Sequence, residues 1–573
     1  MAGLQRGLTD AVPFVLGIAA LTAVGFMSAW LAHICLRCRP SWNVVVINLS
    51  FWVVPVALLI AMTGQPLKSF ALGTALVFVV QRLHWLKWKY TSDTWTAADL
   101  IMLLDRSNWF VLRLYPSVAL FAAASVIGLG LSWLLLPATT PLGWPLRLAA
   151  LGVAAGLVAF DVRFRHAHDF DPFGVNKYGH FANFLFSTTS LKYEPPDVAG
   201  DSRLFLEQAA QLPVPAPRPP ARPPDIVVWL QESATDPRIF DVSGANLPAL
   251  SMHQPDARTL ESGWLRVPTW GGSTWLSEFG LLTGLSHTDF GAAGQAVFYT
   301  VTSHLRYSLP RLLQRHGYRC IVLFPVKKTF YNAEAAYKDL GFDEILTPLD
   351  FPEWGNKSLV TNIVEDRDLF SYALKILSRS RTQPVFLYML SMIQHGPYDP
   401  SREPRFGLDR GALNRATAGR LSDWLGRMEK LSDDTLDFDK VLQATGRDLQ
   451  LTYFGDHQPN LEGQVSLAGA LDEPRFLTRF TIKGPGAPPV ATRPEQVLDV
   501  RFLGSLLLEH AGIPGDDFFA ASGAMRQLCG GTMLGCKDVA LAESYRSFVF
   551  RDLSAAEWTH GLPHTGRELR QLA

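Results

Sequence analysis

Net charge, basic runs and cysteine are all scarce in this sequence. Its 52 Lys and Arg residues balance 52 Asp and Glu residues, so the formal net charge is zero, and no long basic run stands out. Nucleic-acid binding depends on a basic patch or run, so we expect no nucleic-acid partner. Of the five cysteines, Cys529 and Cys536 have a spacing and glycine content that permit a small disulfide loop, with free thiols as the alternative.

Long apolar runs, in contrast, are abundant at one end of the chain. A helix of about 20 apolar residues can cross a membrane. Five spans are predicted, the third and fifth with arginines that reach toward the membrane surface: 11–36, 44–64, 69–86, 117–136 and 141–160. The first has too long an apolar core for a cleavable signal peptide. The spans carry few internal charges and no visible repeat, which argues against a transporter.

The charges of the loops conflict with one orientation of these spans. If the chain starts in the cytoplasm, five spans place the large C-terminal part outside. The basic residues then outside are Arg37, Arg39, Lys87, Lys89, Arg163 and Arg165, against Arg6, Lys68 and Arg147 inside. Membrane proteins usually keep such residues in the cytoplasm, so loop charge alone favours a cytoplasmic C-terminal domain or a different number of spans.

Two segments separate the apolar region from the rest of the chain. Residues 171–197 are rich in aromatic side chains and could form helices along the membrane surface or a packed connector. Residues 211–225 are dense in proline, which excludes a helix and favours an extended, semi-rigid spacer. We therefore predict a transmembrane domain at 1–165, interfacial helices and a linker at 166–224, and a second domain at 225–573, long enough for one large core.

The second domain alternates short strand-like and helix-like patterns. The runs 225–231, 319–324, 384–391 and 449–454 are rich in β-branched and aromatic residues, and amphipathic segments lie between them. This alternation predicts an α/β domain around a largely parallel sheet. In such sheets, ligands bind beyond the carboxyl ends of the strands.

Polar side chains follow three of these strands. Glu232 ends the first, His395 comes shortly after the third, and Asp456 and His457 directly follow the fourth. Each alone could be an ordinary loop residue, but together they could bind a divalent cation at one edge of the sheet.

The stretch WGGSTWLSEFGLLTGL at 270–285 joins a glycine-rich loop to an apolar helix. Glycines such as Gly272 let the backbone approach a bound group, and a helix N-terminus suits a phosphate. Ser273 or Thr274 could be a plain helix cap. Next to a metal, one of these hydroxyls could instead serve as a nucleophile.

Glu232, GGSTWLSEF, QHGPY and FGDHQP, in this order, resemble the sulfatase-like phosphotransferases of the alkaline phosphatase superfamily. Lipoteichoic acid synthases and phosphoglycerol transferases are the most similar, and phosphoethanolamine transferases are more distant. The resemblance covers nearly the whole chain, including KWKYTSDTWTAADL (87–100) between the third and fourth spans. It implies a protein of the bacterial inner membrane. Its catalytic domain would be of alkaline phosphatase type and would lie outside the cytoplasm.

The resemblance also implies roles for individual residues. Thr274, four residues before Glu278, corresponds to the nucleophile, and His395 to a residue that contacts the phosphate or the leaving group. Tyr331 corresponds to an aromatic residue of the glycerol-phosphate site. Ala333 departs from the pattern, since the family has Arg there, so Lys327, Lys328 or another Arg would supply the charge. The implied metal ligands are Glu232, Thr274, Asp456 and His457.

The chemistry so implied is a two-step transfer. Thr274 attacks a phospholipid headgroup, phosphatidylglycerol first or phosphatidylethanolamine, and diacylglycerol leaves. A glycan or glycolipid hydroxyl then receives the group. The resemblance favours Mn²⁺ as cofactor, with Zn²⁺ or Mg²⁺ as alternatives.

Rival functions remain at this stage. Phosphoethanolamine transfer to a glycan or to lipid A, and hydrolysis of the phospholipase C type with water as acceptor, would use the same residues. A true sulfatase would need a CxPxR motif, and CRPSW at Cys38 lacks it. A non-catalytic membrane scaffold is disfavoured because the four metal-binding residue types are all present.

Overall fold

The computed structural model describes residues 41–556, except 92–93, 111–115, 167–169, 171–177, 190–191, 214–221, 361, 380–381, 411–412, 462–464, 470–471, 486–496, 535 and 537. The chain forms two compact units, Met1–Lys192 and Tyr193–Ala573. The second unit thus begins before the proline-rich segment, most of which lies outside the described residues. The division at residue 192 lies within the predicted connecting segment 166–224.

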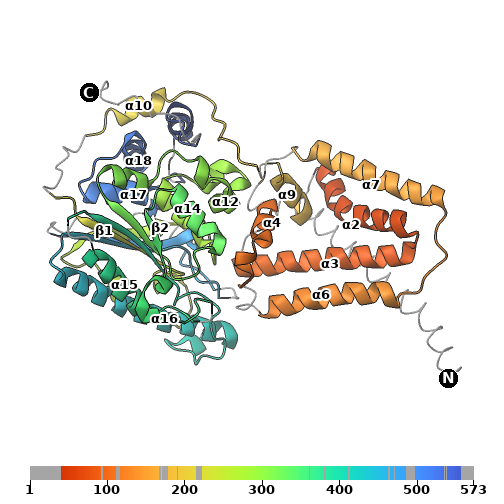
Figure 1. Cartoon of the computed structure of the whole chain (residues 1–573), viewed down its shortest axis with the longest axis horizontal. Helices are drawn as coiled ribbons and strands as arrows, with labels where there is room; N and C mark the ends of the chain where they lie inside the picture. Colours follow the sequence, from red (N-terminus) through yellow and green to blue (C-terminus); the bar gives the residue numbers. More distant parts are fainter. Residues whose placement is uncertain are drawn as a thin grey trace. The chain divides into compact units, whose positions relative to one another are not determined.

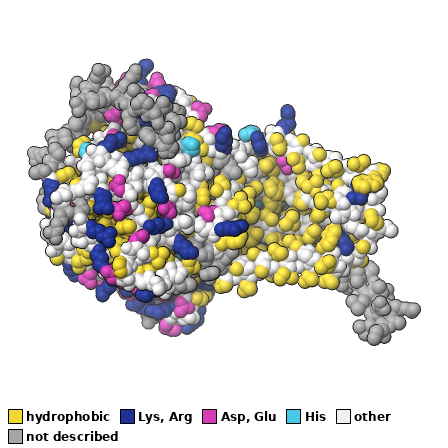
Figure 2. Space-filling model, in the orientation of Figure 1, with side chains coloured by type: hydrophobic (Ala, Val, Ile, Leu, Met, Phe, Trp, Pro, Cys, Tyr) yellow, Lys and Arg dark blue, Asp and Glu magenta, His cyan; other side chains and the backbone are white. Residues whose placement is uncertain are grey.

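The described part of the first unit is helical (Figure 1). Its helices are α2 (Trp42–Thr63), α3 (Pro66–Thr91), α4 (Ala97–Leu104), α6 (Pro116–Leu135), α7 (Trp144–Phe164) and α9 (His180–Ser187). Four of them, α2, α3, α6 and α7, are long and apolar enough to cross a membrane. They correspond to the second to fifth predicted spans, and the first, 11–36, lies outside the described residues. Figure 2 shows hydrophobic side chains over these helices.

Arginine side chains sit near aromatic rings on the predicted third and fifth spans. The Arg82 guanidinium lies 3.9 Å from the Trp85 ring centroid, and that of Arg147 lies 4.2 Å from the Trp144 ring. Arg147 also donates to the carbonyl of Ala61 at 2.8 Å, near the end of α2. Long basic side chains of this kind can keep their charge near a helix end while the stem covers apolar surface.

The aromatic-rich stretch after α7 is packed into the first unit. Phe181, Ala182 and Phe186 of α9 are buried. The Asn48 side chain on α2 donates to the carbonyl of Tyr178 at 2.8 Å, and the Ser187 hydroxyl accepts from the amide of Ala97 at 2.7 Å. These contacts tie α9 to α2 and to α4 within the first unit.

The second unit is built around one eight-stranded sheet in the order β4-β3-β5-β1-β6-β7-β2-β8. The strands are β1 (Asp225–Gln231), β2 (Thr259–Arg266), β3 (Arg319–Leu323), β4 (Glu344–Leu346), β5 (Val385–Ser391), β6 (Leu449–Gly455), β7 (Leu477–Lys483) and β8 (Val497–Asp499). All pairings are parallel except those of β7 with β6 and with β2. The predicted α/β fold with a largely parallel sheet is confirmed.

Helices cover both faces of this sheet (Figure 1). The α-helices of the second unit are α10 (Arg203–Ala209), α11 (Thr274–Thr283), α12 (Val297–Thr300), α13 (Leu309–Arg315), α14 (Ala333–Asp339), α15 (Asp366–Arg379), α16 (Arg415–Ala444), α17 (Val500–His510), α18 (Asp517–Leu528) and α19 (Val539–Ser547). Alternate residues of β1 serve the two faces: Val228 packs in the core with α11 and α17, and Trp229 in the core with α15 and α16. Burial on both faces explains why β1 reads as a continuous apolar run.

The segment at the start of the second unit is anchored on its C-terminal helices. Phe205 of α10 is 1% exposed, and its ring contacts those of Tyr545 and Phe548 with centroids 5.1 and 5.5 Å apart. Its amide donates to the Ser544 hydroxyl at 3.0 Å. Residues 193–212 are thus part of the packing of the second unit.

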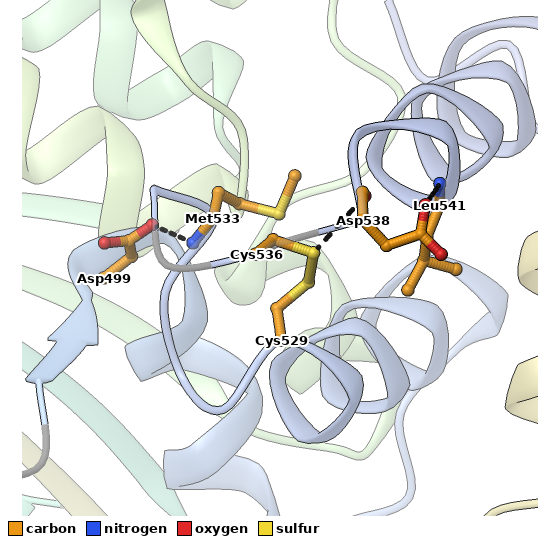
Figure 3. The surroundings of a disulfide bond; sticks show 6 residues. All are labelled: Asp499, Cys529, Met533, Cys536, Asp538 and Leu541. Carbon is orange, nitrogen blue, oxygen red and sulfur yellow. Dashed lines mark hydrogen bonds between the residues drawn. A yellow bond between two sulfur atoms is a disulfide. The ribbon is translucent and has the colours of Figure 1, made fainter.

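Cys529 and Cys536 form a disulfide between α18 and α19 (Figure 3). The loop it closes is held from the other side, because the amide of Met533 donates to Asp499 at 2.8 Å. Asp538 then caps α19 by accepting from the amide of Leu541 at 3.0 Å. The disulfide alternative left open by the sequence is the one the structure adopts, whereas Cys320 is a buried free thiol.

Candidate active site

The register of the sheet brings three polar residues together. Gln231, the last residue of β1, pairs with Gly455, the last residue of β6. The residues that follow, Glu232 and Asp456, therefore emerge side by side, with His457 next to them. Ligand atoms of these three residues all lie within 4.8 Å of one another, and each side chain is at most 2% exposed.

Short contacts fix the geometry of this triad. The His457 Nε2 atom lies 3.2 Å from Glu232 Oε1 and 3.2 Å from Asp456 Oδ2. Asp456 Oδ1 accepts from the amides of Ser233 at 2.8 Å and His457 at 2.9 Å, and the Ser233 hydroxyl donates to Glu232 Oε1 at 3.0 Å. One oxygen of Asp456 is thus held by the backbone, while its other oxygen faces His457.

The three groups perturb one another's proton affinity. Burial raises the pKa of Asp456, and the charge of Glu232 raises it further. Burial alone would raise the pKa of Glu232, but the adjacent His457 outweighs it and holds that pKa below its usual range. Burial opposes the charged form of His457, yet the two carboxylates raise its pKa to about 9. A positive charge is therefore strongly favoured between the two carboxylates.

The donor set fits a divalent cation. Asp456 Oδ2 and His457 Nε2 are buried and lie 3.2 Å apart, but neither makes a contact with hydrogen-bond geometry in the described structure. Unsatisfied buried atoms of this kind are costly unless something binds them. Carboxylate oxygens with one imidazole nitrogen suit Zn²⁺ or Mn²⁺, and Mg²⁺ when oxygen ligands dominate.

Thr274 lies at the start of α11 beside this triad. Gly271 and Ser273 both have positive φ, 72° and 65°, which turns the chain sharply into the helix. The Thr274 hydroxyl donates to Glu232 Oε2 at 3.0 Å. The next turn of α11 is tied to the same place, because the Ser277 hydroxyl donates to the carbonyl of Asp456 at 2.6 Å. The carbonyl of Gly272 accepts from the Thr269 hydroxyl at 2.6 Å.

His395 lies in the turn after β5, half-buried and close enough to Glu232 to lower the pKa of that carboxyl. Its Nδ1 atom is 2.5 Å from the carbonyl oxygen of Gly396. A carbonyl only accepts hydrogen bonds, so Nδ1 carries the proton of this contact and Nε2 is the other ring nitrogen. The structure thus gathers Glu232, Thr274, Asp456, His457 and His395.

The predicted substrate residues lie in other surroundings. Tyr331 is 6% exposed, and its hydroxyl donates to Glu278 Oε1 at 3.0 Å. The Lys328 ammonium pairs with Asp350 at 3.1 Å, whereas Lys327 is exposed. Ala333, which stands where the family has Arg, is fully buried at the start of α14. The tyrosine hydroxyl and one of the two lysines are therefore engaged within the protein.

Glu278 forms a buried cluster for which the sequence suggested no role. It lies on α11, one turn after Thr274, and accepts from the hydroxyls of Tyr331 at 3.0 Å and Tyr337 at 2.5 Å. Burial raises the pKa of Glu278 to about 7, and these tyrosines and Tyr388 of β5 oppose that rise. The cluster joins the helix of Thr274 to α14 and the sheet. Ser233 and Ser277, which hold the triad, were missed too, because nothing in the pattern marks a serine as a positioning residue.

Comparisons with known proteins place this site in a family. The sequence model described as Sulfatase matches residues 224–513. An uncharacterized protein of Haemophilus influenzae is 30% identical over 526 residues, which cover 87% of this chain and 93% of that protein. Lipoteichoic acid synthase 1 of Bacillus subtilis is 24% identical over 30% of this chain and 27% of its own length. The structure of the Streptococcus pyogenes phosphoglycerol transferase GacH with sn-glycerol-1-phosphate has 16% identity, a TM-score of 0.47, and coverage of 63% of this chain and 95% of that chain.

Gly455 allows the end of β6 to approach the chain after β1. A Cβ atom at this position would lie 1.8 Å from the carbonyl oxygen of Ala234. We expect Gly455→Ala to lower the free energy of unfolding by about 1–3 kcal/mol, as overpacked cores do. The displaced Asp456 should also bind metal less tightly. Gly469→Ala is the control, since its Cβ would meet nothing within 4 Å. Equal denaturant midpoints for the two variants would contradict this account.

Proposed function

The chain belongs to the sulfatase family, and from this we propose that it transfers a phospholipid headgroup through a phosphothreonine. Phosphoglycerol is the first choice of group, and a hydroxyl of a cell-envelope glycan or similar molecule is the acceptor. The observation that carries the proposal is the position of Thr274. Its hydroxyl sits at a helix N-terminus, 3.0 Å from a carboxylate of the triad.

Thr274, Glu232, Asp456 and His457 would together hold one divalent cation, Mn²⁺ first and Zn²⁺ or Mg²⁺ otherwise. When bound, the cation would lower the pKa of the threonine hydroxyl and offset charge on the phosphoryl oxygens. Glu232 orients the hydroxyl by accepting its hydrogen bond. The N-terminus of α11 adds its positive dipole end, and Gly272 just before it lets the backbone approach a bound group.

The first half of the reaction joins Thr274 Oγ1 to phosphorus and breaks the bond from phosphorus to the diacylglycerol oxygen. The hydroxyl proton of Thr274 passes to Glu232 Oε2, which accepts its hydrogen bond at 3.0 Å, and returns to Oγ1 when the phosphothreonine breaks in the second half. His395 would give the diacylglycerol oxygen its proton through Nε2. In the second half, the same imidazole takes a proton from the acceptor hydroxyl as it attacks the phosphothreonine. The transferred group thus leaves the enzyme bound to the glycan, and His395 returns to its starting state.

The headgroup rests on sequence similarity. Lipoteichoic acid synthase 1, which this chain resembles over 30% of its length, supports phosphatidylglycerol as donor. Lys327 would supply charge near the phosphate, and Lys328 would do so only after leaving Asp350. Tyr331 would act through the position of Glu278 on α11, to which its hydroxyl donates. Phosphatidylethanolamine as donor, with a glycan or lipid A as acceptor, is the second candidate, because Ala333 departs from the phosphoglycerol pattern. A hydrolase of the phospholipase C type would use the same groups with water.

We place the protein in a bacterial inner membrane with its second unit outside the cytoplasm. Four helices long and apolar enough to cross a membrane support the first part. The disulfide between Cys529 and Cys536 supports the second, since disulfides persist in oxidising compartments. The charges of the loops favour the opposite orientation, so the matter calls for a direct test.

Thr274→Ala should reduce turnover of the donor lipid by a factor of roughly 10³ or more, as loss of other covalent nucleophiles does. The variant should remain folded because Thr274 is only partly buried. Purified protein with Mn²⁺ is incubated with phosphatidylglycerol and, separately, phosphatidylethanolamine. Intact mass then reports the adduct on Thr274, and diacylglycerol is assayed. Thr288→Ala, at an exposed threonine, is the control, and full activity of Thr274→Ala would eliminate the mechanism.

Adding Mn²⁺ to metal-free protein should raise its thermal unfolding midpoint. At a hundred times the Kd, the stabilisation is about 2.7 kcal/mol. Because His457 binds a metal only without its proton and has a pKa of about 9, the stabilisation should be larger at about pH 8 than at about pH 6. Asp456→Asn should lose the effect and exposed Asp472→Asn should keep it. An unchanged response in Asp456→Asn would count against this metal site.

A reporter fused after Ala573 tests the orientation. We expect activity from an alkaline phosphatase fusion and no fluorescence from a green fluorescent protein fusion, since the first is active only outside the cytoplasm. The same pair fused after Lys68, in the loop predicted to be cytoplasmic, should give the reverse. A fluorescent fusion after Ala573 would place the second unit in the cytoplasm instead.

A further inference from the structure

We propose that Arg427 of α16 is a positioning residue that holds His395 in its working orientation. The proposal rests on the proposed function, because it concerns the imidazole that would protonate the leaving oxygen. Arg427 lies about 30 positions after His395 in the sequence, on a helix that packs against the turn of His395. The turn in question is residues 393–398, which follows β5.

The guanidinium of Arg427 binds this turn at three backbone carbonyls. Its Nη1 atom donates to the carbonyl of Ile393 at 3.1 Å and to that of His395 at 2.7 Å. Its Nη2 atom donates to the carbonyl of Pro397 at 3.3 Å. Every second residue of the turn is thus tied to one rigid, planar group. Bonds from a charged donor are about twice as strong as neutral ones.

Arg427 is itself held in place. Its Nη2 atom pairs with Asp423, one helical turn earlier, at 2.7 Å. Its guanidinium carbon lies 5.2 Å from the ring centroid of Tyr398, and the Tyr398 hydroxyl donates to the carbonyl of Gln394 at 2.8 Å. The Gln394 side chain in turn donates to buried Asp366 at 3.0 Å. The turn is therefore fixed from α16 on one side and from the start of α15 on the other.

These contacts make Arg427 unsuited to bind phosphate directly. Both terminal nitrogens already donate to protein oxygens, and Asp423 offsets the charge. Arg427 therefore does not supply the positive charge that an arginine in place of Ala333 would bring to the phosphate. Its effect on the reaction would pass through the backbone of His395, whose own carbonyl receives the shortest of its bonds to the turn.

Fixing this backbone also fixes the imidazole. Nδ1 of His395 donates to the carbonyl of the next residue, Gly396, so the ring orientation depends on the local chain conformation. With the turn held, Nε2 keeps one direction. Without Arg427, three carbonyls lose a charged donor and the ring is free to follow the turn.

The test compares Arg427→Met and Arg427→Lys with Arg405→Met. Arg405 is a matched control because it also pairs with a carboxylate of α16, Glu429 at 2.8 Å, and stacks on Phe406. Two substrates are used with the full-length protein and Mn²⁺: phosphatidylglycerol, whose leaving alkoxide needs a proton, and bis(p-nitrophenyl) phosphate, whose leaving phenolate does not. Hydrogen–deuterium exchange of residues 393–399 reports the turn directly.

We expect Arg427→Met to lower kcat on phosphatidylglycerol by roughly 10- to 100-fold, part of what a general acid contributes. On bis(p-nitrophenyl) phosphate the rate of the first p-nitrophenol release, followed in a single turnover before the phosphothreonine is resolved, should change by no more than about threefold, since forming the phosphothreonine from that substrate does not need the acid. Hydrogen–deuterium exchange in the turn should be faster in Arg427→Met than in the wild type. In both kcat and exchange, Arg427→Lys should fall between Arg427→Met and the wild type, and Arg405→Met should match the wild type. In the His395→Ala background, Arg427→Met should add no further loss.

Equal losses on both substrates, or additive losses with His395→Ala, would overturn the positioning role and leave a general effect on folding. If the wild type fails on phosphatidylglycerol and phosphatidylethanolamine, the proposed function is wrong, but the exchange measurement still decides the inference. Unchanged exchange in both Arg427 variants then refutes it, and faster exchange confined to the turn supports it. Should Arg427→Met not fold, Arg427→Lys carries the same comparison.

Discussion

The close approach of two buried carboxylates is the constraint around which the second unit is arranged. Glu232 and Asp456 emerge from adjacent parallel strands at the same level, because Gln231 pairs with Gly455. Like charges so close, on two buried side chains, repel each other unless a cation lies between them. In the described structure His457 takes that place, 3.2 Å from each. The fold thus holds Glu232 and Asp456 in a position that requires a positive charge between them. A divalent metal ion, with two charges, would offset their repulsion better than a protonated imidazole.

The helix that carries Thr274 is anchored at two points one turn apart. At its first residue, Thr274 is hydrogen-bonded to Glu232, and four residues later Glu278 is held by tyrosine hydroxyls. The two carboxylates differ in environment: Glu232 faces a cationic partner, whereas Glu278 is surrounded by neutral donors and has its pKa raised by burial to about 7. The strained Ser273, with φ of 65°, persists because these anchors over-determine the start of the helix.

Much of the second unit could be predicted from the sequence because its central strands are buried on both faces. β1, β3, β5 and β6 appear as apolar runs, and the polar residues after β1 and β6 do meet. Other features depend on distant parts of the chain. The antiparallel β7 and the bonds from Arg427 to the turn of His395 leave no local pattern. Tyr331 was predicted to line the substrate site, but its hydroxyl bonds to Glu278, which only the packing of α11 on α14 reveals.

The packing of α10 changes where the second unit can be cut. The proline-rich segment looks like the natural place to separate a soluble fragment from the membrane helices. Residues before it, however, pack against α19 and the residue that follows it. Phe205 lies against Tyr545 and Phe548. The hydroxyls of Ser544 and Ser547 donate to the carbonyls of Asp201 and Ala199, respectively. A fragment that starts at residue 225 would lack Phe205 and would expose this apolar surface to water. A fragment that starts at Tyr193 would keep α10, which covers this surface.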